Sequence, residues 1–216
     1  MGADRRLLGL LGGERDPGVD VAEAAATGGC GELADFHHRP SYTGDGATSY
    51  VNLGFVPATH GVNCTGTNQR IGAYECTNIS NTGRSAGAFD TSTRVLSLLN
   101  RNATNMAGHL NHLGVSIALT LADSRGLKVV SRAGGGTAVL SYDRGVRLAD
   151  AVAAAPGSGA PTSSLFALAR NNAGTPDLFR AAALGFVVVG GPLSDAQELA
   201  QYNAVQAWAT SVGAQV

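Results

Sequence analysis

The chain is poor in charge and has no long apolar run. Charged residues make up only 14% of its 216 residues, against roughly 25% in an average globular protein. The formal net charge is −1, so no strong field draws the chain to nucleic acid or to an anionic membrane. No stretch of 18 apolar residues occurs, and a helical membrane span needs about that length. We therefore predict neither nucleic-acid binding nor a membrane span.

Cysteine is also scarce, with Cys30, Cys64 and Cys76 only. An odd number argues against a disulfide framework. We expect free buried thiols in a protein assembled in the cytosol, and a Cys64–Cys76 disulfide is the alternative. The first residues, MGADRRLLGLLGGERD, lack the longer apolar core and cleavage site of a signal peptide, so we expect none.

Residues 1–36 differ in composition from the rest of the chain and are rich in Ala, Gly and Leu. The sequence favours a short helix over Arg5–Leu11 and another over Val19–Thr27, each followed by a glycine pair. A segment this short buries little apolar surface by itself. We predict an N-terminal arm or anchor that docks on a partner.

Residues 40–216 have the pattern of a β domain. We expect strands at these positions: 70–76, 93–99, 113–121, 127–132, 137–142, 146–151, 163–170 and 182–190. In LGVSIALTL (113–121) aliphatic residues alternate, which is the period of a half-buried strand. Thirty glycines fit the many tight turns between short strands. This spacing of short strands predicts an antiparallel sandwich or barrel.

A closing helix is predicted over residues 195–212. Ser194 is the expected N-cap, and Gln197 completes a capping box. The apolar stripe is predicted to comprise Leu199, Tyr202, Val205, Trp208 and Val212. Because Trp208 lies on this stripe, we assign it to the core or to an interface rather than to a sugar site.

Six segments together resemble a known family. They read TGDGATSYVNLGF, NTGRSAGAF, LTLADSRGLKVVSR, YDRGVRLADA, FALARNNAGTPDLF and FVVVGGPLSDAQELAQYNAVQAW. The pattern is similar to the concanavalin A-like, laminin-G-like lectin domain found in bacteriophage virion and tail proteins, and it covers residues 40–216. The resemblance implies an all-β, concanavalin A-like antiparallel β-sandwich (jelly roll). It also implies that the Asp143–Gly145 turn joins two long central strands, and that the protein is an oligomer, with a trimer favoured.

The residues for common catalysis are missing. Glycosidases place two carboxylates on either side of the bond they cleave, but the only glutamates in 40–216 are Glu75 and Glu198. His109 and His112 have no cysteine or carboxylate nearby in the sequence, so we interpret them as ordinary histidines of a surface loop. We predict no enzyme activity, no metal and no cofactor.

Sugar binding needs an aromatic face together with planar amides, hydroxyls or arginines. Two polar stretches offer such groups: Arg170, Asn171 and Asn172, and the denser Asn100, Arg101, Asn102 and Asn105. The alternative for both stretches is that the side chains close tight turns and cap backbone groups.

We therefore predict a non-enzymatic virion protein: a fibre, spike or decoration protein whose lectin-like domain binds a host-surface polysaccharide. Residues 1–36 would bind other virion proteins, on the surface of a virion or phage-like particle that is assembled in the bacterial cytoplasm. A purely structural cement protein without glycan binding is the first alternative. A glycan-cleaving enzyme with an unusual site is the second.

Overall fold

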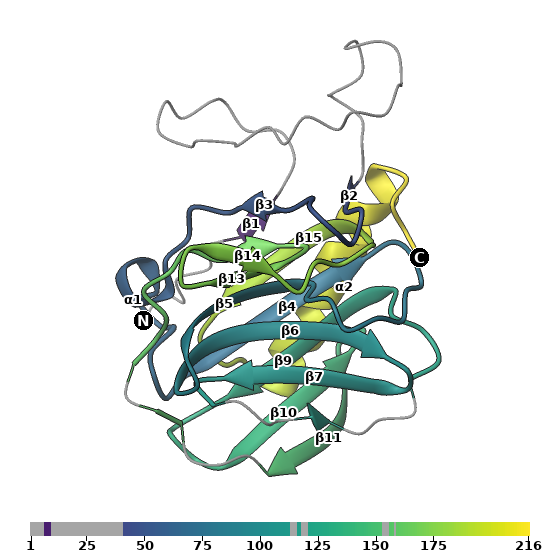
Figure 1. Cartoon of the computed structure of the whole chain (residues 1–216). Coiled ribbons are helices and arrows are strands. Elements are labelled where there is room, and N and C mark those ends of the chain that lie inside the picture. Colours follow the sequence, from purple (N-terminus) through teal and green to yellow (C-terminus); the bar gives the residue numbers. More distant parts are fainter. Residues whose placement is uncertain (1–6, 10–40, 113–115, 118–120, 153–155, 158) are drawn as a thin grey trace.

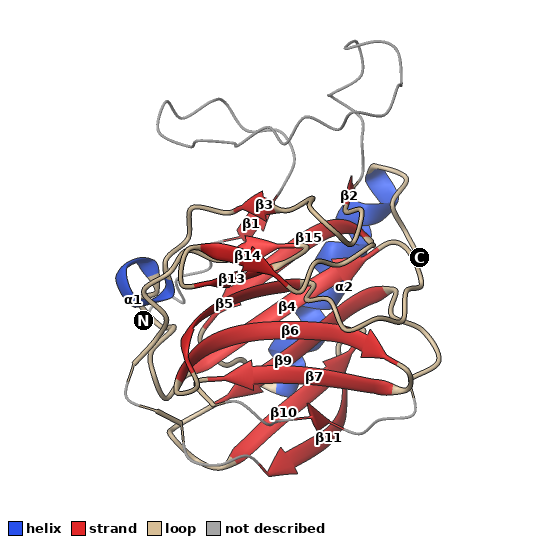
Figure 2. Cartoon of the chain, in the orientation of Figure 1, coloured by secondary structure: helices blue, strands red, loops and turns tan. Residues whose placement is uncertain are grey.

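Two β-sheets face each other, and one long helix lies against the outside of the first sheet (Figure 1). The computed structural model describes residues 7–9, 41–112, 116–117, 121–152, 156–157 and 159–216. Strands dominate, and α2 (Asp195–Ser211) follows the last of them (Figure 2). The predicted all-β sandwich with a C-terminal helix is confirmed. The structure adds one short helix, α1 (Pro57–His60).

The first sheet is antiparallel throughout. Its spatial order is β1 (Leu7–Gly9), β15 (Ala183–Gly190), β4 (Gln69–Glu75), β9 (Gly126–Arg132), β10 (Ala138–Asp143) and β11 (Val146–Val152), and β2 (Tyr42–Thr43) also pairs with β15. The strands predicted at 70–76, 127–132, 137–142, 146–151 and 182–190 are thus confirmed to within a residue or so. Their β-branched and aromatic residues suit a pleated, half-buried surface.

The second sheet contains one parallel pair. Its order is β14 (Thr175–Asp177), β13 (Arg170–Asn172), β5 (Ala86–Thr91), β6 (Arg94–Asn102), β7 (Asn105–Leu110) and β8 (Ser116–Ile117), and β12 (Phe166–Ala167) pairs with β5 and with β3 (Val51–Asn52). β13 runs parallel to β5, so the sandwich is not purely antiparallel. The strand predicted at 163–170 is divided into β12 and β13, because the chain turns at Leu168 with a φ of 62°.

Alternate residues of both sheets form the core between them. From the first sheet come Ile71, Ala73, Val130, Val139 and Val187, and from the second come Ala88, Leu96, Leu98, Met106 and Leu110. Each large aliphatic side chain buried in this way stabilises the fold by about 1.5–3 kcal/mol. The core also holds a buried ion pair between Glu75 and Arg180, and Ser85 donates a hydrogen bond to the same carboxylate.

Helix α2 covers the outer face of the first sheet. The predicted capping box of Ser194 and Gln197 is present. Val205 and Ala209 are buried against the sheet, and the Trp208 ring packs 5.5 Å from that of Phe186. This contact confirms that Trp208 belongs to the packing of the helix.

The predicted stripe of α2 is wrong at Leu199. This side chain is 45% exposed, whereas Glu198 is only 1% exposed. Successive helical residues turn by about 100°, so Leu199 and Trp208, nine residues apart, lie on opposite sides of the helix. Glu198 takes the inward position instead, and its carboxylate accepts two hydrogen bonds of 2.5 Å from Arg70 of β4.

The hairpin between β10 and β11 has the predicted turn. Arg144 and Gly145 both have positive φ values, 52° and 77°, as a type I′ hairpin turn requires. A side chain at Gly145 would approach the Cα of Leu199 to 2.9 Å, so glycine also allows the turn to pack on α2. However, β11 lies at the edge of the sheet, which corrects the prediction of two central strands.

Two further predictions concern the N-terminal arm and the cysteines. Residues 7–9 form strand β1, paired with β15, so the helix predicted over 5–11 is wrong there. The helix predicted over 19–27 lies outside the described residues, as does most of the strand predicted over 113–121. Cys64 and Cys76 are free, as expected, and burial raises the pKa of the Cys64 thiol to about 12.

Candidate functional site

The outer face of the second sheet, which points away from the first sheet, brings a set of polar and aromatic side chains together. Paired residues on neighbouring strands share a face of the sheet. Asp177 pairs with Arg170, and Asn172 pairs with Phe89. On the next strands, Gly87 pairs with Ser97, and Ser97 pairs with His109. The outer face therefore carries Asp177, Arg170, Asn172, Phe89, Ser97 and His109.

Arg170 is held in place across this face. Its Nε and Nη2 donate hydrogen bonds of 2.8 and 2.6 Å to the two oxygens of Asp177. Its guanidinium carbon lies 4.6 Å from the centre of the Phe89 ring, within the range of a cation–π contact. A side chain on Gly87 would come within 3.2 Å of the Arg170 Cγ. Glycine at that position therefore lets the arginine lie flat on the sheet.

Arg84 carries a second guanidinium, whose charge interacts with that of Arg170. Its backbone N–H donates to the carbonyl of Leu178, and the residue lies just before β5. Burial, together with the charges of Arg170 and Arg180, lowers the pKa of Arg84 to about 10, against the attraction of Asp177. Its Nε is buried and has no hydrogen-bond partner. Arg84 is thus a partly desolvated cation near other cations.

His109 belongs to the same group. The Ser97 Oγ and His109 Nδ1 lie 3.2 Å apart. Burial lowers the pKa of His109 to about 4, helped by the charges of Arg84, Arg170 and His112, so this imidazole is neutral at pH 7. His109 lies on β7, which corrects the prediction of a surface loop for this residue.

An aromatic cluster continues the same face beyond Gly87. Phe166 pairs with Gly87 in the register of β12 and β5, and its ring centre lies 4.6 Å from that of Tyr50. The Phe179 ring centre lies 6.3 Å from that of Tyr50. Tyr50 and Phe179 are half-buried, so each keeps part of its surface exposed. The face therefore offers aromatic rings beside arginine, amide and imidazole groups.

The first predicted stretch, Arg170–Asn172, forms strand β13, and its three residues have different environments. Arg170 and Asn172 share Asp177, because the Asn172 amide donates to the same carboxylate at 3.0 Å. Asn171 points inward and is 3% exposed. Its amide donates to the carbonyl of Ser164 and accepts from the N–H of Gly174. Asn171 therefore closes the turn and presents little to a ligand.

The second predicted stretch spans the end of β6 and the start of β7. Asn100 is fully buried, and its amide donates to the backbone carbonyls of Ala73 and Ser124. Asn100 therefore links the sheets in the interior and is out of reach of a glycan. Asn102 is exposed and Asn105 is half-buried, paired with each other beside the hairpin turn.

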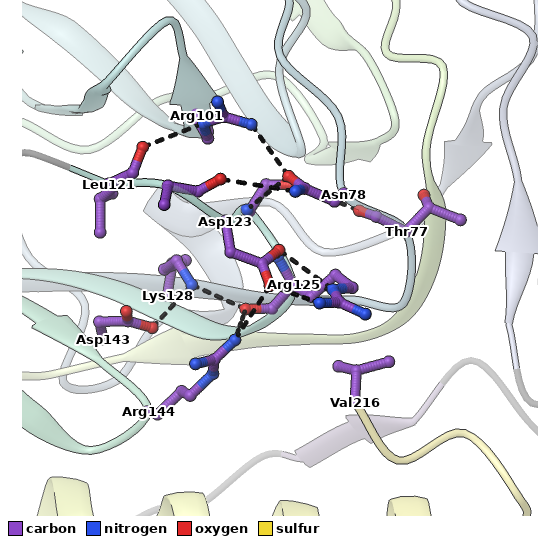
Figure 3. Close-up of polar contacts among 12 residues, drawn as sticks. Thr77, Asn78, Arg101, Leu121, Asp123, Arg125, Lys128, Asp143, Arg144 and Val216 are labelled. Atoms are coloured by element: carbon purple, nitrogen blue, oxygen red, sulfur yellow. Dashed lines mark hydrogen bonds and ion pairs between the residues drawn. The ribbon is translucent and has the colours of Figure 1, made fainter.

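Arg101 lies beside a second charged cluster (Figure 3). It donates to the carbonyl of Leu121 and to the side chain of Asn78. In the same view Asp123 lies between Arg125 and Arg144, with which it forms ion pairs. The hydrogen bonds and charge of Arg125 lower the pKa of Asp123 to about 2. These contacts tie Arg144, and with it the β10–β11 turn, to the loop before β9.

In the part of the chain that the structure describes, no group of three or more His, Cys, Asp or Glu side chains is arranged to hold a metal ion. No helix among the described residues is long and apolar enough to cross a membrane.

Sequence reasoning missed Phe89, His109 and Asp177 as members of this face. Asp177 had a usable signal, because a hairpin that turns at Ala173–Gly174 places position 177 opposite position 170. The other two depend on strands brought together from distant parts of the chain. These residues become neighbours only through the order of the strands in the sheet, so no local pattern in the sequence predicts that they meet.

Comparison with known proteins identifies the fold. No protein-family model matches the chain, and no curated protein matches its sequence significantly.

Among solved structures, the chain is similar to the NanB sialidase from Streptococcus pneumoniae, with a TM-score of 0.55 and 9% identity over 74% of this chain. The chain spans only 27% of that sialidase. It is also similar to the CBM40 domain of the Ruminococcus gnavus IT-sialidase, with a TM-score of 0.50 and 13% identity over 75% of this chain and 97% of that domain. The chain therefore has a lectin-like β-sandwich fold that sialidase-associated CBM40 domains also have.

Proposed function

We propose that this chain is a non-enzymatic glycan-binding domain and that the outer face of the second sheet binds the glycan. The observation that supports it most is the combination of aromatic rings with arginine, amide and imidazole groups on one sheet face. Sugars bind to such faces because their C–H surfaces pack on aromatic rings while their hydroxyls pair with planar polar groups. The fold shared with a CBM40 domain supports the same proposal.

A binding role is favoured over hydrolysis. Asp177 is the carboxylate on this face, and Arg170 and Asn172 already occupy its oxygens. Glycosidases instead need a pair of carboxylates available on the two sides of the scissile bond. Glu75 and Glu198, the two glutamates of the sandwich, are buried in ion pairs with arginine.

The proposal also includes a biological setting for the glycan-binding domain. The sequence resemblance to bacteriophage lectin-like domains motivates a fibre, spike or decoration protein that attaches a virion to host polysaccharide. In that setting, residues 1–36 bind other virion proteins and the chain forms a homo-oligomer. Co-purification of the chain with particles, and its mass by light scattering, test these two points directly.

Binding of the full-length chain to a glycan array and to host cells tests the central claim. Asn172→Ala removes a half-buried amide of the outer face, and Phe89→Ala removes a ring. We expect saturable binding that falls at least tenfold in each variant. The matched control is Asn203→Ala, on the exposed side of α2, which should bind like the parent chain. A folded chain that binds no glycan would overturn the proposal and favour the cement protein.

A further inference from the structure

Two separate segments of the chain cover one edge of β15. Strand β1 pairs antiparallel with it from Phe186 to Val188, and β2 pairs antiparallel with it at Ala183 and Leu184. The two segments therefore run in the same direction, in line along the edge, and only the position of Gly185 separates them. The other edge of β15 is paired with β4. β15 thus takes up strands from two places in the sequence at a single edge.

The link between these two segments is far longer than their spacing requires. Gly9 pairs with Phe186 and Tyr42 pairs with Leu184, so the two ends are two strand positions apart, or about 7 Å. A single residue would bridge that distance, but 32 residues, 10–41, lie between Gly9 and Tyr42. A link of that length reaches at most about 110 Å when it is fully extended. β1 can therefore reach the β15 of a neighbouring copy as well as its own.

We propose that the edge of β15 is a strand-acceptor site and that β1 of one copy pairs with β15 of another, which links the copies into the homo-oligomer. This inference rests on the oligomer included in the proposed function and names the segment and the edge that join its copies. The edge of a sheet presents backbone N–H and C=O groups that an added strand pairs. Because every copy carries the same Leu7–Gly9 segment and the same β15, the register between copies is the one formed within the chain.

A second copy fits this edge better than a strand from another protein. A foreign strand would displace β1 and leave it without a partner. Exchange between copies instead keeps one β1 on every β15, so no backbone pairing is lost when the copies join. Reciprocal exchange closes a dimer and cyclic exchange closes a trimer, and either one keeps the edge of every β15 covered. The linked copies would also present several glycan-binding faces, whose combined avidity exceeds the affinity of one.

The test places the two cysteines of one disulfide in different chains. Leu8 pairs with Val187, so one full-length chain carries Leu8→Cys and a second, made larger by a tag, carries Val187→Cys. Cys30, Cys64 and Cys76 are changed to Ala in both chains, so that the introduced thiols are the only ones. The two chains are produced together in one cell, purified and mildly oxidised. We expect a disulfide-linked product of one untagged and one tagged chain, which a reductant separates.

A matched control places the second cysteine on the exposed side of α2. Asn203→Cys in place of Val187→Cys should lower the yield of the mixed disulfide about tenfold, because only Val187 lies opposite Leu8. A single chain with both Leu8→Cys and Val187→Cys should form covalent products of more than one chain. If Val187→Cys does not fold, Leu7→Cys with Val188→Cys probes the same pair of strands.

Every other outcome overturns the exchange of strands. Disulfides formed only within single chains would show that β1 stays on its own β15. A mixed disulfide no more abundant than in the Asn203→Cys control would come from chance collisions. An oligomer seen by light scattering without the mixed disulfide would be held together by another surface. Glycan binding is measured separately on the array, so its absence beside a mixed disulfide would overturn the proposed function and leave the strand exchange standing.

Discussion

The two outer faces of this sandwich differ in what covers them. On the first sheet, α2 buries Tyr74, Leu127, Phe186 and Val188, and a buried Arg70–Glu198 ion pair joins helix and strand. On the second sheet, the outer face carries half-buried Phe89, Arg170 and Asn172 instead. A β-sheet needs one buried face to be stable, and the core between the sheets already supplies it. The covered outer face of the first sheet therefore contributes stability, whereas the outer face of the second sheet is available to bind a ligand.

The strongest test of this division is the ion pair under the helix. Glu198→Ala leaves the guanidinium of Arg70 buried without its acid, which typically costs about 3–5 kcal/mol. We expect the free energy of unfolding, measured with urea, to fall by that amount. Glycan binding under native conditions should be unchanged, because α2 lies on the opposite side of the sandwich.

A double variant separates charge from packing at the same place. Arg70→Met with Glu198→Leu replaces both charges by apolar groups, an exchange that is often neutral or stabilising in other proteins. We expect most of the lost stability to return. A double variant as unstable as Glu198→Ala would mean that the apolar packing of α2, rather than the unpaired arginine, carries the loss.

The second test uses pH and probes the outer face of the second sheet. The native pKa of His109 is about 4, below the ordinary value of about 6.5 in an unfolded chain. Between these values the unfolded state binds the proton more readily, so the stability from neutral His109 is complete above about pH 6.5 and is lost as the pH falls toward 4. The free energy of unfolding falls by at most about 1.4 kcal/mol per pH unit, which amounts to about 3 kcal/mol between pH 6.5 and pH 4.

Replacing the histidine identifies its share of that loss. His109→Gln keeps a polar side chain beside Ser97 and cannot take up a proton. We expect its free energy of unfolding to decline less between pH 6.5 and 4 than that of the parent chain. Parallel curves for the two proteins would contradict the assignment of this pH dependence to His109.

The third test changes the charge of the outer face of the second sheet. Asp177→Asn removes the acid that pairs with Arg170, so the local potential becomes more positive. We expect the affinity for an acidic glycan to rise about three- to tenfold, or about 0.7–1.4 kcal/mol. Asp195→Asn makes the same change of charge on an exposed residue at the start of α2 and should have little effect. Weaker binding in Asp177→Asn would mean that its hold on Arg170 outweighs its charge.

Local patterns predicted much of the fold. The capping box at Ser194 and the turn at Arg144–Gly145 were found because their chemistry lies within a few residues. The order of the strands in the two sheets could not be predicted in this way, because it depends on pairing between distant parts of the chain. The site shows the same limit: Arg170 and Asn172 reach the face, but Asn100 and Asn171 are buried. An asparagine in a polar stretch gives no local sign of whether its strand points it inward or outward.

The smallest expected effect concerns the helix itself. Val205 is buried against the first sheet, whereas Leu199 is 45% exposed, although an apolar stripe in steps of three residues groups them together. Leu199→Ala should therefore change the free energy of unfolding by less than about 0.5 kcal/mol. Val205→Ala removes buried methyl groups and leaves a cavity, at a cost of about 2 kcal/mol. Equal losses in the two variants would mean that Leu199 packs in solution as the stripe predicts, which would turn α2 on its axis and move Glu198 away from Arg70.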